Sequence, residues 1–163
     1  MEKLSLEAWL GQAQAEGNRF GDFCLSYQAK ENELTEEQLL ERMEKILDVM
    51  EESIAIGLSG APSMGGLVGG MGKQVAEYRE QQMDKSLVGP TVSKAIMIAL
   101  AIGEANASMG RIVAAPTAGA SGTLPAVLFS LAELRDFSKR DLAKGLVTAG
   151  VIGMVIASRA SLS

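Results

Sequence analysis

The chain has 163 residues, of which 47% are apolar and only 4% aromatic, so its core must be built from Leu, Ile, Val, Met and Ala. This composition favours packed helices over a β-sandwich, and the length suggests one domain. The net charge of −5 argues against a nucleic-acid partner, and one cysteine without any histidine excludes an internal disulfide, a zinc site of Cys and His ligands, and a histidine-based catalytic triad.

The charged residues are unevenly distributed along the chain. Residues 1–52 hold 13 acidic and 5 basic side chains, whereas residues 53–163 hold 7 acidic and 10 basic ones. Either the first part is simply a solvated acidic surface, or the second part builds a site for a small anion. Charge alone leaves both interpretations open.

Three helices are predicted before the first glycine-rich segment. Ser5 is an N-cap for a helix that Gly17 would stop, and a short second helix carries Cys24 among aromatic residues, as a small core side chain. A capping box at residues 35–38 starts the third helix, which ends near Gly57. The apolar stripe of this third helix is Leu39, Met43, Ile46, Leu47, Met50 and Ile54.

The segment 59–72 carries six glycines, which predicts a loop with unusual backbone angles or one that a ligand approaches closely. A short polar helix is expected at Lys73–Gln82. Pro90 suits the first turn of the next helix, which runs to about Met109. That helix is apolar nearly all round, so we expect it to be central and buried, with Lys94 extending its ammonium group to solvent.

Two more helices are expected in the last third of the chain. One spans Leu124–Leu134 behind a loop at Thr117–Thr123, and the other runs from Lys139 to Ala160 after a second capping box. Small residues in the final helix would let another helix approach closely, and its uncharged stretch of 14 residues is shorter than a membrane span requires. The prediction is therefore an all-α, compact helical domain of six to seven helices with glycine-rich connecting loops, in a cytoplasmic protein without membrane contact.

Two loops, at 59–72 and 117–123, are dense in small residues and hydroxyl groups. They could be tight helix–helix connections, with Ser121 or Thr123 as an N-cap. They could instead line one pocket for a small carboxylate-bearing ligand, because a loop before a helix offers N–H groups and hydroxyls to an anion. Asn106 could orient such a ligand or cap its own helix. The sequence leaves both interpretations open and assigns no catalytic base.

Four blocks of sequence carry a resemblance to a known family. They are Ser63–Gly70, Glu104–Gly110, Ala115–Gly122 and Thr148–Ser163, and the Pro-Thr-Ala-Gly run at 116–119 is the most specific part. In this order, over nearly the whole chain, they resemble the α chain of the two-subunit iron–sulfur L-serine dehydratases. The short amphipathic start also resembles that α chain more than the fused single-chain form of the enzyme.

The resemblance implies an enzyme that converts L-serine to pyruvate and ammonia. In that family a [4Fe–4S] cluster held by cysteines acts as a Lewis acid on the serine hydroxyl and carboxylate, a base removes the α proton and hydroxide leaves. The resemblance further implies that the substrate carboxylate or amino group is held by Ser63, Gly66, Ser121 and the turn Thr117-Ala118-Gly119. Asn106 would orient these residues without touching the substrate itself.

Two departures from the family qualify this expectation. The family's first cluster cysteine follows the position of Ser163, and one thiol cannot hold a cluster that needs at least three. We therefore expect residues 1–163 to be the N-terminal part of the α-chain catalytic domain, inactive alone and holding no metal. Polar or acidic residues that the family often has at the positions of Met64 and Met71 are also absent.

The expected partners are L-serine and a β chain, a C-terminal continuation of this chain, or both, in an oligomer. The resemblance does not separate L-serine from L-threonine as substrate. The alternative to an enzyme is a non-catalytic helical module that serves assembly or binds a small carboxylate.

Overall fold

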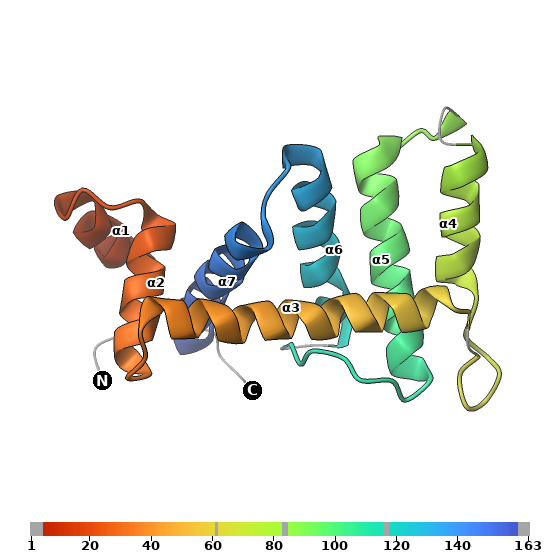
Figure 1. The fold of residues 1–163 in the computed structure, drawn as a ribbon, viewed down its shortest axis with the longest axis horizontal. Coiled ribbons are helices and arrows are strands. Elements are labelled where there is room, and N and C mark those ends of the chain that lie inside the picture. The colour runs from red at the N-terminus through yellow and green to blue at the C-terminus, as the bar shows by residue number, and fades with distance from the viewer. Residues whose placement is uncertain (1–4, 61, 83–84, 116–117, 160–163) are drawn as a thin grey trace. The chain divides into compact units, whose positions relative to one another are not determined.

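The computed structural model describes residues 5–60, 62–82, 85–115 and 118–159. Within these ranges the chain forms seven α-helices and no strand, which confirms the predicted all-α fold (Figure 1). The chain divides into two compact units rather than one: unit 1 is made of residues 1–44 and 139–163, and unit 2 of residues 45–138. Each unit has its own buried apolar cluster, so the two are described separately.

Unit 1 contains α1 (Leu6–Ala15), α2 (Phe20–Glu31), the first turns of α3 (Glu36–Leu58) and α7 (Lys139–Arg159). Its helix ends follow the predicted capping pattern. The Ser5 hydroxyl accepts the Ala8 N–H (3.3 Å). A second capping pair closes reciprocally, because Gln38 N–H donates to Thr35 Oγ1 (3.1 Å) while Thr35 N–H donates to Gln38 Oε1 (3.0 Å).

Aromatic residues gather in unit 1 around its only cysteine. Cys24 is fully buried, as predicted, in a cluster with Phe23 and residues of α1 and α7. Trp9 and Tyr27 pack at its edge with ring centroids 4.8 Å apart. Most of the chain's aromatic side chains thus serve one small core.

Helix α7 is amphipathic within unit 1. Its buried residues Ala143, Val147, Val151 and Val155 recur every four positions on one face. Close approach of another helix was predicted at its small residues, but the sites of a Cβ at Gly150 and Gly153 meet no atom within 4 Å, because both lie off the buried face. By length and composition alone, α7 is the one helix of the described residues long and apolar enough to cross a membrane.

Unit 2 is organised around α5 (Gly89–Ala107), which packs against both α4 (Met71–Gln82) and α6 (Ala118–Arg135). This confirms the expectation of a central helix that begins with Pro90 in its first turn. The expectation that this helix is buried is wrong for one side of it, where Val92 and Ile96 are exposed. Glycines from three neighbouring segments pack against small residues of α5: Gly57 and Gly72 lie against Ala101, and Gly122 lies against Ala99. Such contacts require glycine because a Cβ would meet the backbone of α5.

Helix α6 begins at Ala118, six residues earlier than predicted. Gly119, Gly122 and Pro125 were interpreted as loop residues, since glycine and proline both weaken a helix. Packing outweighs that cost here: Gly122 is buried with the position of a Cβ 3.0 Å from the Ala99 carbonyl oxygen, and Pro125 is fully buried. The predicted loop at 117–123 is therefore mostly the first turns of a helix.

Candidate functional site

One end of unit 2 carries three of the four blocks that resemble the family, whereas the block that begins at Thr148 belongs to unit 1. Because α4, α5 and α6 alternate in direction, the N-terminal ends of α4 and α6 and the C-terminal end of α5 point the same way (Figure 1). The glycine-rich loop precedes α4, and the connection 108–117 precedes α6. Within the described residues, the predicted site residues of both loops and Asn106 therefore belong to this end.

The glycine-rich loop is closed by hydrogen bonds to Ser63. The Ser63 N–H donates to the Val68 carbonyl (2.7 Å), and the Val68 N–H donates back to the Ser63 hydroxyl (3.1 Å). The Gly66 N–H donates to the Ser63 carbonyl (2.8 Å), with Gly66 at φ 65°. Glycine takes this backbone angle at the lowest steric cost, which explains its presence at this turn. Ser63 thus shapes the loop before any ligand is considered.

Side chains of this loop make little contact with the rest of unit 2. Met64 is 86% exposed and Leu67 92% exposed. Met71, the first residue of α4, is also exposed. The loop is therefore held by its main chain and the Ser63 hydroxyl, and neither Met64 nor Met71 supplies a group that titrates or accepts a strong hydrogen bond.

A buried acid meets the end of the loop. The Glu104 carboxylate, which is 2% exposed, accepts the Met71 N–H at 2.6 Å and lies 3.4 Å from the Gly72 nitrogen. Two N–H groups at the start of α4, which lack partners inside the helix, are satisfied in this way. Sequence analysis quoted Glu104 only as part of a block and missed this contact; the available signal was an acid inside an otherwise apolar helix.

The start of α6 presents a different set of groups. Gly119 is exposed, whereas Ser121 is 5% exposed and faces the interior of unit 2. Neither Ser121 nor Thr123 is the N-cap, because both lie inside the helix, and the Thr123 hydroxyl donates to the Gly119 carbonyl one turn earlier (3.0 Å). Ala118 opens the helix, and Thr117 lies outside the described residues.

Asn106 lies near the C-terminal end of α5 with its side chain exposed. Its carbonyl accepts the Met109 N–H (3.1 Å), so its backbone belongs to the end of the helix while its carboxamide faces solvent. The connection that follows is tied to α3, because Arg111 pairs with Glu52 and the buried Ser53 hydroxyl lies 2.7 Å from the Arg111 carbonyl oxygen. The Ser53 hydroxyl shares its single proton between this carbonyl and that of Val49, also at 2.7 Å. These contacts hold the beginning of the connection 108–115 against α3.

Lys94 forms an ion pair with Glu133 on the neighbouring helix α6. The Lys94 hydrogen bond, and then its charge, lower the pKa of the Glu133 carboxyl below its ordinary value. The predicted extension of Lys94 towards solvent is confirmed in part, since its side chain is 23% exposed and ends on a more exposed acid.

The described residues do not fit a [4Fe–4S] cluster. No group of three or more His, Cys, Asp or Glu side chains in this part of the chain lies close enough to hold a metal ion. Cys24 is buried among aromatic rings in unit 1, where burial raises the pKa of its thiol and so disfavours the thiolate that binds metal. Any cluster must take its ligands from elsewhere.

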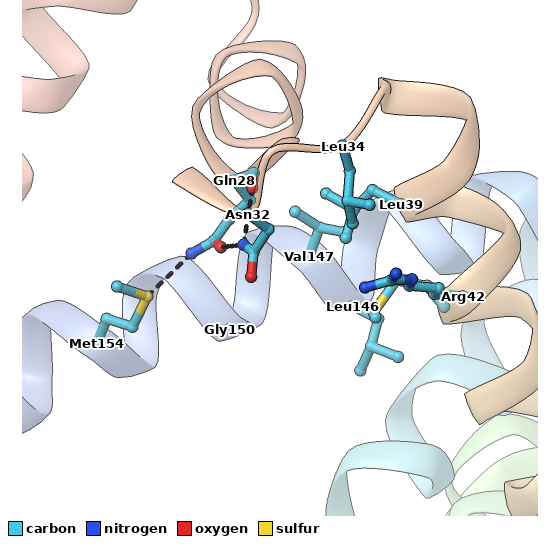
Figure 2. A pocket seen from close by; sticks show the side chains of 10 residues that line it. Gln28, Asn32, Leu34, Leu39, Arg42, Leu146, Val147, Gly150 and Met154 are labelled. Atoms are coloured by element: carbon cyan, nitrogen blue, oxygen red, sulfur yellow. Dashed lines mark hydrogen bonds between the residues drawn. The ribbon is translucent and has the colours of Figure 1, made fainter. Parts of the chain in front are cut away.

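A separate pocket of about 370 Å³ lies in unit 1, between α2, α3 and α7 (Figure 2). Leu39, Leu146 and Val147 provide apolar lining, while Arg42 and Asn32 supply polar groups. The Asn32 carboxamide is oriented by donating to the Gln28 side chain (2.9 Å) and main chain (2.8 Å). The pocket has the chemistry to accept an apolar body with an anionic group, and it contains none of the predicted site residues.

Comparison with known proteins gives a consistent family. The serine dehydratase alpha chain family matches residues 12–163. The chain is 37% identical to the probable L-serine dehydratase, alpha chain, of Bacillus subtilis, over 87% of this chain and 47% of that protein. It is 34% identical to the L-serine dehydratase, alpha chain, of Peptoniphilus asaccharolyticus, over 90% of this chain and 50% of that protein.

A third relative is L-serine dehydratase 2 of Escherichia coli, 33% identical over 79% of this chain and 29% of that protein. The chain spans about half the length of the two alpha chains that it matches. No solved structure matches it.

Proposed function

The chain belongs to the serine dehydratase alpha chain family, and we propose that it forms part of an L-serine ammonia-lyase that converts L-serine to pyruvate and ammonia. The observation that carries this proposal is the family match over residues 12–163, which includes both the glycine-rich loop and the start of α6. Two relatives named as L-serine dehydratase alpha chains support the same activity and substrate.

In this proposal, unit 2 supplies part of the substrate pocket. The exposed backbone of Gly66 and Gly119, the Ser63 hydroxyl and the turn Thr117-Ala118 hold the carboxylate or amino group of L-serine. The positive end of the α6 dipole favours the carboxylate at this place. Ser121, being buried, contributes by fixing the first turn of α6 rather than through an exposed hydroxyl.

The exposed carboxamide of Asn106 completes this pocket in our proposal. It lies two residues beyond Glu104 on the same helix end, so it is carried by the element that also meets the start of α4. A carboxamide offers both a donor and an acceptor, which suits the orientation of neighbouring groups or of the substrate itself.

The iron–sulfur cluster belongs to the proposal but not to these residues. We propose that its cysteines lie in a continuation of the chain, in a β chain, or in both, within an oligomeric enzyme of the cytoplasm. When bound, such a cluster supplies a Lewis acid for the departing hydroxyl group. Residues 1–163 alone are then inactive, because they contain one buried thiol.

The exposed Asn106 offers a direct test of the substrate pocket. In the full-length protein, reconstituted with iron and sulfide under anaerobic conditions, Asn106→Ala should raise the KM for L-serine about tenfold, the loss expected for one hydrogen bond. Ser158→Ala is the matched control and should leave KM unchanged, because the Ser158 hydroxyl binds only the main chain of α7. An unchanged KM in Asn106→Ala would remove Asn106 from the site.

A second candidate function is a small-carboxylate-binding module without catalysis. The unit 1 pocket favours it, because Arg42 there adjoins an apolar lining. Binding of a carboxylate with an aliphatic tail that is lost in Arg42→Leu, together with no pyruvate from the full-length protein, would support this candidate over the enzyme.

A further inference from the structure

Glu104 is the one charged side chain that is buried among the described residues. Removing a carboxylate from water costs several kcal/mol unless hydrogen bonds compensate. Its neighbours along α5 are apolar, so nothing in the packing of that helix calls for an acid. The buried carboxylate must therefore be stabilised by groups from outside α5.

The partners of Glu104 provide that reason. Its carboxylate accepts the Met71 N–H at 2.6 Å, a short charge-assisted hydrogen bond, and lies 3.4 Å from the Gly72 nitrogen. Both donors are the first residues of α4, where the helix has unpaired N–H groups and a positive dipole end. Glu104 thus caps a helix from the side of a neighbouring one.

The backbone geometry at Gly72 makes this contact possible. A Cβ at Gly72 would lie 3.1 Å from the Ala101 backbone, so the two helices approach closely there. Ala101 and Glu104 are three residues apart and share one face of α5. Because α4 packs closely on α5 at Ala101, the start of α4 lies within hydrogen-bonding distance of the Glu104 carboxylate.

The contact lies directly at the end of the glycine-rich loop. The loop is closed at Ser63 by its own hydrogen bonds, but Met64 and Leu67 are exposed and do not anchor it. Gly70, with φ 86°, joins the loop to Met71. The Glu104 carboxylate consequently fixes the point from which the loop extends.

We propose that Glu104 is a positioning residue that anchors the glycine-rich loop, and through it places Ser63 for L-serine. The anchoring follows from the contacts described above. The effect on L-serine rests on the proposed function and deepens it, by assigning a role to a residue that touches no substrate.

The test uses the full-length protein with Glu104→Gln, which keeps the shape of the side chain but removes its charge. Glu133→Gln, an exposed acid on α6, is the matched control. Hydrogen–deuterium exchange of the segment 62–72 should be about tenfold faster in Glu104→Gln and unchanged in the control, because a charge-assisted hydrogen bond is roughly twice as strong as a neutral one. Unchanged exchange in Glu104→Gln overturns the anchoring role.

Kinetics of pyruvate formation then separate positioning from a merely structural role. Glu104→Gln should raise the KM for L-serine several-fold while kcat stays close to the wild-type value. A lower melting temperature with an unchanged KM would show a structural role alone and overturn the proposal. If the wild-type protein forms no pyruvate, the proposed function fails together with the effect on L-serine, whereas the exchange measurement still decides the anchoring of the loop.

Discussion

Gly57 of α3 lies directly on the backbone of Ala101 in α5, so closely that a Cβ on Gly57 would stand 1.8 Å from the Ala101 carbonyl oxygen. Gly72 of α4 makes a second close contact with Ala101, at its nitrogen and its Cα and Cβ atoms. One alanine of the central helix is therefore approached by two glycines. The same approach brings Glu104, one turn further along, to the start of α4.

Gly57→Ala should be strongly destabilising, because the neighbouring atoms are backbone and cannot move aside without separating α3 from α5. We expect a loss of about 3 kcal/mol, at the upper end for overpacking. Urea denaturation of the chain, followed by the circular dichroism signal of its helices, measures this loss of stability.

Gly103→Ala is the matched control for this substitution. Gly103 lies in α5 as well, but a Cβ there meets no atom within 4 Å. The alanine should stabilise the helix by about 0.5–1 kcal/mol, since glycine is the poorer helix former. If both substitutions cost the same, the close contact at Ala101 is not what requires glycine at position 57.

The capping box at the start of α3 should contribute measurably to stability. Thr35→Ala removes the hydroxyl that accepts the Gln38 N–H, and the expected cost is about 1 kcal/mol. Thr35→Ser, which retains an acceptor, should recover most of that loss. Equal melting temperatures for Thr35→Ala and the wild type would show that solvent replaces the cap without cost.

Cys24 should be unreactive in the folded chain. Burial raises the pKa of its thiol, and only the thiolate reacts, so a disulfide reagent at pH 8 should label it only after denaturant is added. Since the folded pKa lies above the unfolded one, this group favours folding at neutral pH, and that contribution disappears as the pH rises through the folded pKa. Rapid labelling of the native chain would contradict the packing of the unit 1 core.

The Lys94–Glu133 pair should add little stability and only above acidic pH. The pair lowers the pKa of the Glu133 carboxyl in the folded chain. Its contribution to stability is therefore present above the pKa that Glu133 has in the unfolded chain, and it is lost as the pH falls through the pKa of the folded chain. Solvent screening limits it to about 1 kcal/mol or less. Denaturation of the wild type and Glu133→Gln from pH 7 down to pH 3 should show a small difference that vanishes in acid.

Local signals explain which parts of the fold could be predicted from the sequence. The capping groups at Ser5 and Thr35 and the proline at the start of α5 act within one turn, so their positions followed from neighbouring residues. The beginning of α6 did not, because the stability of a helix containing Gly122 and Pro125 depends on packing against α5. Long-range contacts overrode local propensity there.

The candidate site was predictable only as a set of segments. Ser63 and Asn106 were found through a resemblance, whereas the Glu104 contact joins residues 33 positions apart in the sequence, which no local pattern reveals. The closure of the loop by Ser63 and Val68 is local, but no turn signal in the sequence marked that pair. The division into two units was also missed, because a continuous helix, α3, contributes to both. No local pattern marks such a boundary inside a helix.

We propose that these residues belong to an L-serine dehydratase that residues outside them complete. The most direct measurement is pyruvate formation from L-serine by the full reading frame, expressed with the proposed β chain and reconstituted anaerobically with iron and sulfide, beside residues 1–163 alone. We predict pyruvate that depends on L-serine and disappears in air for the complete protein, and none for residues 1–163. No pyruvate from the complete, cluster-loaded protein, or pyruvate from residues 1–163 alone, would contradict the account.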